Sequence, residues 1–180
     1  GGGPPPSPPL DDGALAALAR FPGRLEPIYR TVEKVASSLP PETTFLGFAG
    51  SPWTVATYMV TGEASRDHAG AGGFAYRDPG GFSEIIGAIT DMTVDYLSGQ
   101  IEAGVEAVQL FDSWAGSLAP AEFERWVIGP TARIAAAIKQ RHPHVKVIGF
   151  PKGAGGKLAA YARETRVDGI GLDETVDPVW

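Results

Sequence analysis

Small and polar residues gather at four points of the sequence, each time directly after a short apolar run. The four segments are Ala49–Trp53, Asp112–Gly116, Pro151–Gly155 and Asp173–Thr175. They offer hydroxyl, carboxylate, indole and ammonium groups, all of which can hydrogen-bond a polar ligand. A turn that needs Gly and Pro would explain one such segment. Four of them, rich in Ser, Asp, Lys and Trp, favour a binding or catalytic site.

The four apolar runs predict the strands that would carry these segments. They are Thr43–Phe48, Ala107–Phe111, Val145–Phe150 and Gly169–Leu172. Runs of this length, bounded by turn residues, are typical of buried strands. Because the runs are almost continuously apolar, we expect the strands to be buried on both faces of the sheet.

Longer segments between the strands have apolar residues three and four positions apart, which predicts helices. They are Trp53–Val60, Phe82–Ala103, Ala119–Arg141 and Gly156–Arg163, preceded by a helix with apolar positions from Leu25 to Leu39. The stretch between the first two of these segments is expected to be a loop. Strands that alternate with helices predict a parallel sheet. Active sites of such α/β folds lie at the carboxyl ends of the strands.

Two architectures fit this α/β pattern, an open doubly wound sheet and a closed (β/α)8 barrel. Four strands cannot close a barrel, which takes roughly 250 residues for eight units. Residues 1–10 (GGGPPPSPPL) cannot form a helix or a central strand, so we expect a disordered end there. Residues 11–180 are expected to form one domain, whose first helix is capped by Asp11 or Asp12. No Met precedes Gly1, and we expect the start of the protein to be missing.

The composition argues against several classes of function. A net charge of -6 without a cluster of Lys and Arg disfavours nucleic-acid binding. The lack of cysteine excludes disulfides and thiolate metal sites within the sequence, and a reducing cytoplasm is expected. No apolar run approaches the length of a membrane span. His68, His142 and His144 lie away from the strand-end segments, so no metal site or histidine chemistry is predicted.

Four motifs resemble the uroporphyrinogen decarboxylase family, in order and with similar spacing. They are FAGSPWTVATYMV from Phe48, QLFDSWAG from Gln109, FPKGAG from Phe150 and GLDETVD from Gly171. The first two are long and specific, whereas the third is weak alone. The resemblance runs from about Leu10 to Trp180. In the fourth motif this chain has Glu174 where the family usually has Trp, so no contact is assigned to that position.

The resemblance implies a partial (β/α)8 TIM barrel that covers roughly strands three to six. It also implies a homodimer that uses neither a metal nor a cofactor. The implied reaction converts uroporphyrinogen III to coproporphyrinogen III, in haem biosynthesis, by removing carbon dioxide from the acetate side chains.

Five positions of this chain match substrate-binding positions of the family. Tyr58 corresponds to a tyrosine that contacts the substrate, and Ser113 to a serine that contacts a substrate carboxylate. Phe48 and Phe111 correspond to the apolar wall of the cleft, and Gly50 to a glycine where the chain approaches closely. The family's arginine-rich loop and key aspartate are expected before Gly1, and its late histidine after Trp180. No catalytic residue is therefore assigned.

Three other interpretations compete with this one. GAGGKL from Gly153 superficially resembles a phosphate-binding loop, but the required first Gly and final Ser or Thr are replaced by Pro151 and Leu158. A corrinoid-linked methyltransferase would have a similar fold, but the zinc thiolates expected of it are absent here. The third alternative is a catalytically inactive fragment that binds tetrapyrroles. We expect the 180 residues by themselves to be inactive.

Overall fold

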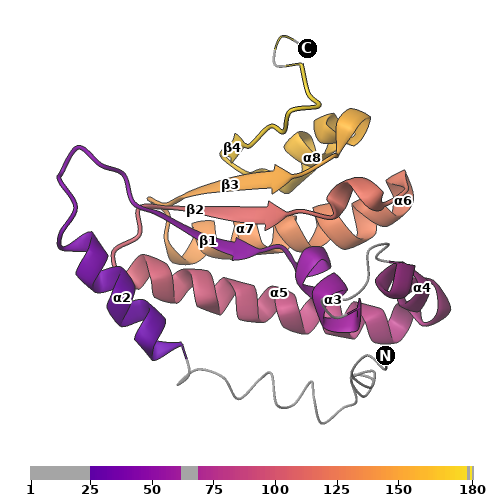
Figure 1. Cartoon of the computed structure of the whole chain (residues 1–180), viewed down its shortest axis with the longest axis horizontal. Coiled ribbons are helices and arrows are strands. Elements are labelled where there is room, and N and C mark those ends of the chain that lie inside the picture. The colour runs from indigo at the N-terminus through magenta and orange to yellow at the C-terminus, as the bar shows by residue number, and fades with distance from the viewer. Residues whose placement is uncertain (1–24, 62–68, 178, 180) are drawn as a thin grey trace, which may run out of the picture.

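The centre of the computed structural model is a four-stranded sheet (Figure 1), and the described residues are 25–61, 69–177 and 179. The strands are β1 (Leu46–Gly50), β2 (Ala107–Asp112), β3 (Lys146–Pro151) and β4 (Gly169–Ile170). Every neighbouring pair is parallel, and the strands follow one another in sequence order. The predicted parallel sheet is therefore confirmed. The disordered end predicted for residues 1–10 and the helix predicted from Asp11 lie outside the described residues.

The first strand begins at Leu46, later than the predicted Thr43. The N–H of Thr43 donates to the carbonyl of Pro40 at 3.0 Å, which places Thr43 in a turn. The N–H of Phe45 donates to the Glu106 carboxylate at 2.8 Å rather than to a neighbouring strand. Threonine favours strands, but the turn at Thr43 and the side-chain contact of Phe45 keep the segment outside the sheet.

Three long connections pack on one face of the sheet. They contain α5 (Pro79–Glu102), α7 (Gly129–Arg141) and α8 (Leu158–Thr165). Side chains of α5 and α7 form a buried core with alternate strand residues, which are Ala49, Val108, Leu110 and Val147. Tyr161 of α8 packs beneath Gly149, where an added Cβ would meet its ring. Since successive strand residues point to opposite faces, all three helices cover the same face.

The opposite face of the sheet is open in the part of the chain that the structure describes. Phe48 is 63% exposed and Phe111 is 37% exposed on this face. The prediction that the strands are buried on both faces is therefore wrong for these residues. Doubly wound sheets carry helices on both faces, whereas a barrel carries all of its helices outside. The one-sided cover identifies the fold as a partial (β/α)8 barrel, as the resemblance implied.

The longest helix, α5, shows why the sequence predicted it correctly. Its core-facing residues recur at helical spacing and are fully or almost fully buried, namely Phe82, Ile85, Ile86, Ile89, Val94 and Leu97. Asp78 caps the helix because its side chain accepts the N–H of Gly81 at 2.9 Å. An earlier helix, α2 (Glu26–Ala36), packs Tyr29 against Gly99 of α5.

The stretch between Val60 and Phe82 was expected to be a loop, but Ala69–Arg77 form a helix, α4. Three glycines give this segment a low intrinsic helix propensity. Its stability comes from packing instead, since Ala71 and Ala75 are buried in the main core. The ring of Phe74 also lies edge-on to Phe82 of α5, with the ring centroids 5.7 Å apart.

The helix predicted over Ala119–Arg141 is interrupted by a wide turn. α6 (Pro120–Phe123) leads into a π-helical turn, η3 (Glu124–Ile128), and α7 follows. Within this turn the N–H of Gly129 donates to the carbonyl of Glu124. Pro130 has no N–H and would clash with the preceding turn of a regular α-helix, which accounts for the wider turn there. The bulge brings three consecutive residues, 126–128, into the core.

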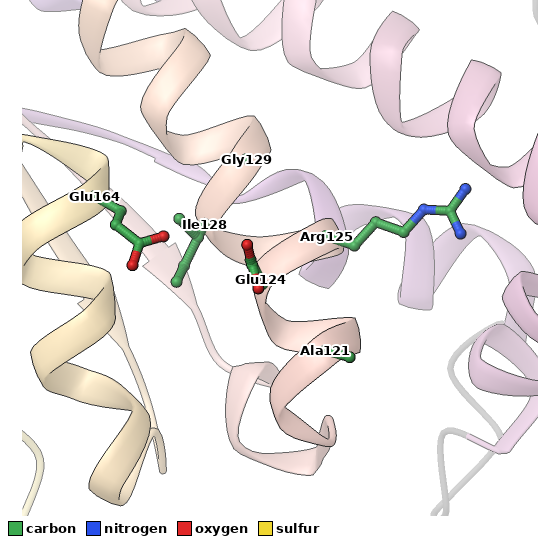
Figure 2. Close-up of a pocket in the computed structure, with 6 residues that line it drawn as sticks. All are labelled: Ala121, Glu124, Arg125, Ile128, Gly129 and Glu164. Atoms are coloured by element: carbon green, nitrogen blue, oxygen red, sulfur yellow. The ribbon is translucent and has the colours of Figure 1, made fainter.

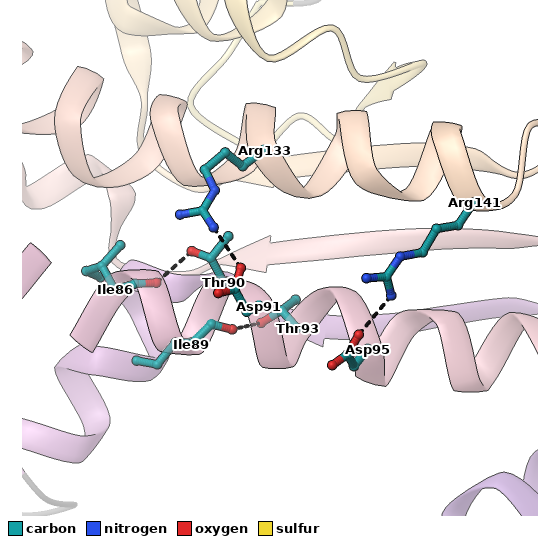
Figure 3. A network of polar contacts seen from close by, with 8 residues as sticks. All are labelled: Ile86, Ile89, Thr90, Asp91, Thr93, Asp95, Arg133 and Arg141. Carbon is teal, nitrogen blue, oxygen red and sulfur yellow. Dashed lines mark hydrogen bonds and ion pairs between the residues drawn. The ribbon is translucent and has the colours of Figure 1, made fainter. Parts of the chain in front are cut away.

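The outer surfaces of α5 and α7 are joined by two ion pairs (Figure 3). Arg133 binds Asp91 at 2.7 Å, and Arg141 binds Asp95 at 2.8 Å. All four side chains are exposed, so we expect each pair to contribute little to stability. On the buried side of α5, the hydroxyl of Thr90 donates to the carbonyl of Ile86 at 2.6 Å. Both residues of this bond belong to α5, and they are far in sequence from the strand-end segments.

Candidate active site at the carboxyl ends of the strands

The parallel register brings the predicted strand-end segments to one edge of the sheet. Gly50 lies opposite Phe111, and Asp112 lies opposite Pro151. The segments that follow these positions are therefore neighbours. β1 continues into α3 (Pro52–Thr61), β2 into the short helix η2 (Ala115–Ser117), and β3 into η4 (Gly155–Lys157). The sequence-based prediction that these segments converge is confirmed.

A row of phenylalanine rings crosses the open face of the sheet next to this edge. The ring centroids of Phe48 and Phe111 are 5.8 Å apart and nearly perpendicular, and Phe111 and Phe150 repeat the same spacing. Phe48 and Phe111 were predicted as wall residues. Phe150 was not predicted, although its alternation with buried Val147 and Gly149 in β3 placed it on the same face. The row offers an apolar surface for a flat ring system.

Gly50, predicted as a point of close approach, lies where β1 turns into α3. A Cβ at this position would lie 2.9 Å from Cγ2 of Val55. Val55 has a short, stiff side chain that cannot move aside easily. The requirement for glycine is thus explained by packing within the chain.

Tyr58 and Ser113, the two predicted polar contacts, lie on neighbouring elements. Tyr58 lies on α3 and is 50% exposed, and Ser113 follows β2 directly and is partly exposed. The indole of Trp114 joins them, because its ring lies edge-on to the Tyr58 ring at a centroid distance of 6.3 Å. The Trp53 indole N–H also donates to the carbonyl of Trp114 at 3.2 Å. The contacts of Trp114 therefore hold α3, which carries Tyr58, against the turn that carries Ser113.

The loops after β2 and β3 cross each other very closely. The N–H of Gly116 donates to the carbonyl of Lys152 at 2.9 Å. A Cβ on Gly116 would lie 2.7 Å from the carbonyl oxygen of Gly153, which itself has a φ of 70°. Glycine at both positions is required, one by close approach and one by its positive φ.

The two lysines beside this crossing have different surroundings. Lys157 donates to the carbonyls of Leu118 at 2.6 Å and Gly116 at 3.2 Å, so it fastens the loop after β2. Burial lowers the pKa of Lys157. Lys152, the basic residue predicted at the strand ends, is exposed. Of these two lysines, Lys152 is the one whose ammonium group can reach an anionic ligand from solution.

The loop after β4 is anchored by Asp173. Its carboxylate accepts the hydroxyl and N–H of Thr175 and, at 2.6 Å, the N–H of Gly153. The hydrogen bond from the Thr175 hydroxyl, followed by those from the two backbone N–H groups, lowers the pKa of Asp173. Asp173 therefore holds the turn that follows β4. Glu174, at the departure from the family motif, is exposed.

Asp112 is buried beneath the site rather than in it. It is 1% exposed, and its carboxylate accepts the Thr54 hydroxyl at 2.6 Å. Burial raises the pKa of Asp112 to about 7, although the hydrogen bond from Thr54 acts in the opposite direction. Because adjacent strand residues point to opposite faces, Asp112 points away from the face that carries Phe111, and its role is structural. Its partner Thr54 was not predicted, because only tertiary packing brings the two together.

Comparisons with known proteins agree with the family resemblance of the four sequence motifs. A sequence model of the uroporphyrinogen decarboxylase family (URO-D) matches residues 3–180. This chain belongs to that family. Uroporphyrinogen decarboxylases of Novosphingobium aromaticivorans and Rhizorhabdus wittichii are 68% and 69% identical to it over all 180 residues. That of Paracoccus denitrificans is 50% identical over 167 residues, or 93% of this chain.

This member of the decarboxylase family spans about half the length of the curated relatives it matches, 53% for the Novosphingobium protein and 49% for the Paracoccus protein. A methyltransferase from Methanosarcina mazei has a similar structure, with a TM-score of 0.72 over 86% of this chain and 43% of its own. Its sequence is only 13% identical, so this likeness shows the fold alone.

Three further observations on the decarboxylase-family chain concern metal ligands, membrane-spanning helices and the histidines. Within the described ranges, no group of three or more His, Asp and Glu residues could hold a metal ion. No helix among the described residues is long and apolar enough to cross a membrane. His142 and His144 lie between α7 and β3, at the amino end of that strand, as predicted. His68 lies outside the described residues.

A hollow of about 420 Å³ lies among the helices (Figure 2), and it is lined by Ala121, Glu124, Arg125, Ile128, Gly129 and Glu164. None of the predicted site residues lines it. Glu124 and Glu164 flank Ile128, whereas the Arg125 side chain extends to the other side of its helix. Its lining carries two carboxylates, those of Glu124 and Glu164, against the one guanidinium of Arg125, and this excess of negative charge is poorly suited to an anionic substrate.

Proposed function

We propose that this chain provides the substrate-binding strand ends of a uroporphyrinogen decarboxylase, a carboxy-lyase that converts uroporphyrinogen III to coproporphyrinogen III. The observation that carries the proposal is the row of phenylalanine rings on the three strands that lead towards α3, which carries Tyr58, and the turn that carries Ser113. The proposal is supported by relatives of that name that match the whole chain. We include in it the homodimer that the resemblance implies and the cytoplasmic location expected from the lack of cysteine.

The proposed substrate suits the chemistry of this edge of the sheet. A tetrapyrrole has flat pyrrole rings, which we place against Phe48, Phe111 and Phe150. Its acetate and propionate arms are anionic and need hydrogen-bond donors. Tyr58 and Ser113 are neutral donors that orient a carboxylate without the cost of desolvating a further charge. Lys152 adds a positive charge at the rim of an otherwise acidic chain.

The proposed reaction needs no cofactor because the pyrrole accepts the electrons. Each acetate arm loses carbon dioxide when its C–C bond breaks, and the electron pair moves into a protonated pyrrole ring. The ring then loses a proton, the former acetate carbon gains one, and a methyl group remains. A carboxylate near the pyrrole nitrogens would stabilise the positive charge. We assign neither that carboxylate nor the proton donor to the described residues.

The decarboxylase is favoured over the two alternatives. The relatives that match the full chain are named decarboxylases, and they favour neither a methyltransferase nor an inactive remnant. The structural likeness to a methyltransferase extends to the fold alone. The chain also has no cysteine that could bind zinc for methyl transfer.

The experiment uses a full-length chimera, in which this chain replaces the matching 180 residues of the Novosphingobium relative. We expect the chimera to form coproporphyrinogen, measured by chromatography of the oxidised porphyrins. Ser113→Ala and Tyr58→Phe are expected to lower kcat/KM by about ten-fold each, because each removes one hydrogen bond to a charged group. Thr90→Val is the control. A folded chimera that leaves uroporphyrinogen unchanged, beside an active parent enzyme, would refute the proposal.

A further inference from the structure

A buried hydrogen-bond chain connects the two elements that carry Tyr58 and Ser113. Thr54 and Asp112 are 4% and 1% exposed, and the Thr54 hydroxyl donates to Oδ1 of Asp112 at 2.6 Å. The same hydroxyl oxygen accepts the backbone N–H of Trp114 at 3.3 Å. One side chain of α3 therefore binds both the last residue of β2 and the turn that follows it.

The position of Thr54 gives this connection a direct effect on the site. Thr54 and Tyr58 are four residues apart in α3, so they lie one turn apart on the same side of the helix. Asp112 and Trp114 are the two neighbours of Ser113 in the sequence. Fixing Thr54 against both of them holds the backbone that carries Tyr58 in place relative to the backbone that carries Ser113.

The other contacts of Asp112 leave its carboxylate dependent on Thr54. Oδ2 of Asp112 is buried and has no hydrogen-bond partner among the described residues. The backbone of Asp112 is held independently, since its carbonyl accepts the N–H of Lys152 at 3.0 Å. The Thr54 hydroxyl is thus the described group that orients this carboxylate, while the strand itself is held by the sheet.

We propose that Thr54 and Asp112 are positioning residues for the substrate, which set Tyr58 beside Ser113 across the gap between α3 and the turn after β2. This inference rests on the proposed function, because its consequence is a change in substrate affinity. Neither residue contacts the crevice, so neither takes part in the chemistry. The indole N–H of Trp53 also binds the Trp114 carbonyl, and loss of the Thr54 hydroxyl should therefore loosen the turn without unfolding the barrel.

The test is Thr54→Val in the full-length chimera, a substitution that keeps the shape of the side chain and removes the hydroxyl. We expect KM for uroporphyrinogen to rise about ten-fold while kcat changes less, since a displaced contact weakens the binding of substrate and transition state alike. Thr54→Ser restores the hydroxyl and should restore KM. Thr90→Val removes a buried hydroxyl from α5 that, among the described residues, is bonded only within its own helix (Figure 3), and should leave KM unchanged.

Hydrogen–deuterium exchange separates this inference from the proposed function. Exchange of the segment 111–118 should become faster in Thr54→Val and stay unchanged in Thr54→Ser and Thr90→Val. Equal KM values in Thr54→Val and Thr90→Val, or unchanged exchange of this segment in Thr54→Val, would overturn the positioning role. If the unsubstituted chimera shows no decarboxylation, the proposed function fails, while the exchange data still decide whether Thr54 holds the turn.

Discussion

Replacing Asp112 with Asn should change how the stability of the protein depends on pH. The pKa of Asp112 is about 7 in the folded protein because the carboxyl group is buried, against an ordinary value of 3.8. Between these two values the folded state binds a proton that the unfolded state has released. Stability therefore falls as pH rises from about 4 to about 7, and the loss levels off above that range.

The size of this effect follows from the difference between the two pKa values. One pH unit corresponds to about 1.4 kcal/mol, so the full range from 3.8 to 7 corresponds to about 4 kcal/mol at most. Asn keeps an oxygen that accepts the Thr54 hydroxyl but does not ionise. Relative to the unsubstituted protein, Asp112→Asn should gain stability steadily from pH 4 to pH 7 and keep that gain at higher pH.

Urea unfolding of the chimera and of Asp112→Asn at a series of pH values measures this difference. Asp91→Asn provides the control for loss of a carboxylate, because Asp91 is exposed on α5 and bound to Arg133 (Figure 3). The reasoning is refuted if the difference between the chimera and Asp112→Asn is constant between pH 4 and pH 7. A difference that grows with falling pH would refute the sign as well.

Two further predictions compare matched pairs of substitutions in the same chimera. Gly116→Ala places a Cβ 2.7 Å from a backbone oxygen and should destabilise the protein by about 1–3 kcal/mol. The added Cβ of Gly87→Ala, in α5, meets nothing within 4 Å and should stabilise the protein by about 0.5–1 kcal/mol. Equal urea midpoints of the two variants would contradict this prediction. Phe111→Ala should weaken substrate binding with a loss of stability under about 2 kcal/mol, whereas fully buried Phe82→Ala should cost about 3–5 kcal/mol. Titration of each variant with coproporphyrin measures binding, and thermal melting measures stability. Similar melting temperatures of Phe111→Ala and Phe82→Ala would contradict the exposed position of Phe111.

Much of the fold could be predicted because the strands and long helices have regular apolar spacing. α5 illustrates this, since its buried residues recur at the positions that the sequence marked. α4 could not be predicted in the same way, because its glycines disfavour a helix and its stability depends on distant residues such as Phe82. The π-helical turn before Pro130 was missed for a related reason. Proline indicates that a regular helix is disturbed, but not which geometry replaces it.

The candidate site was predictable to a different extent. The strand-end segments follow from the order of elements alone, and Tyr58 and Ser113 remain predictions that rest on their motifs. Thr54 could not be recognised, because its role depends on a hydrogen bond to a residue 58 positions away. Phe150 was within reach of the sequence, since alternation in β3 separates it from the core-facing residues.

The open face of the sheet explains why the apolar strand pattern led to a wrong prediction of burial on both faces. It also indicates what this face could bind. Apolar strand residues indicate that something covers them, but the pattern does not say whether it is a helix or a ligand. Phe48 is 63% exposed, and its ring and that of Phe111 meet edge to face rather than packing under a helix. Fully burying one such side chain is worth about 1.5–3 kcal/mol. A flat apolar ring laid on this face would gain part of that free energy from each phenylalanine. Beside Tyr58 and Ser113, the same gain would favour a macrocycle whose anionic arms reach those donors.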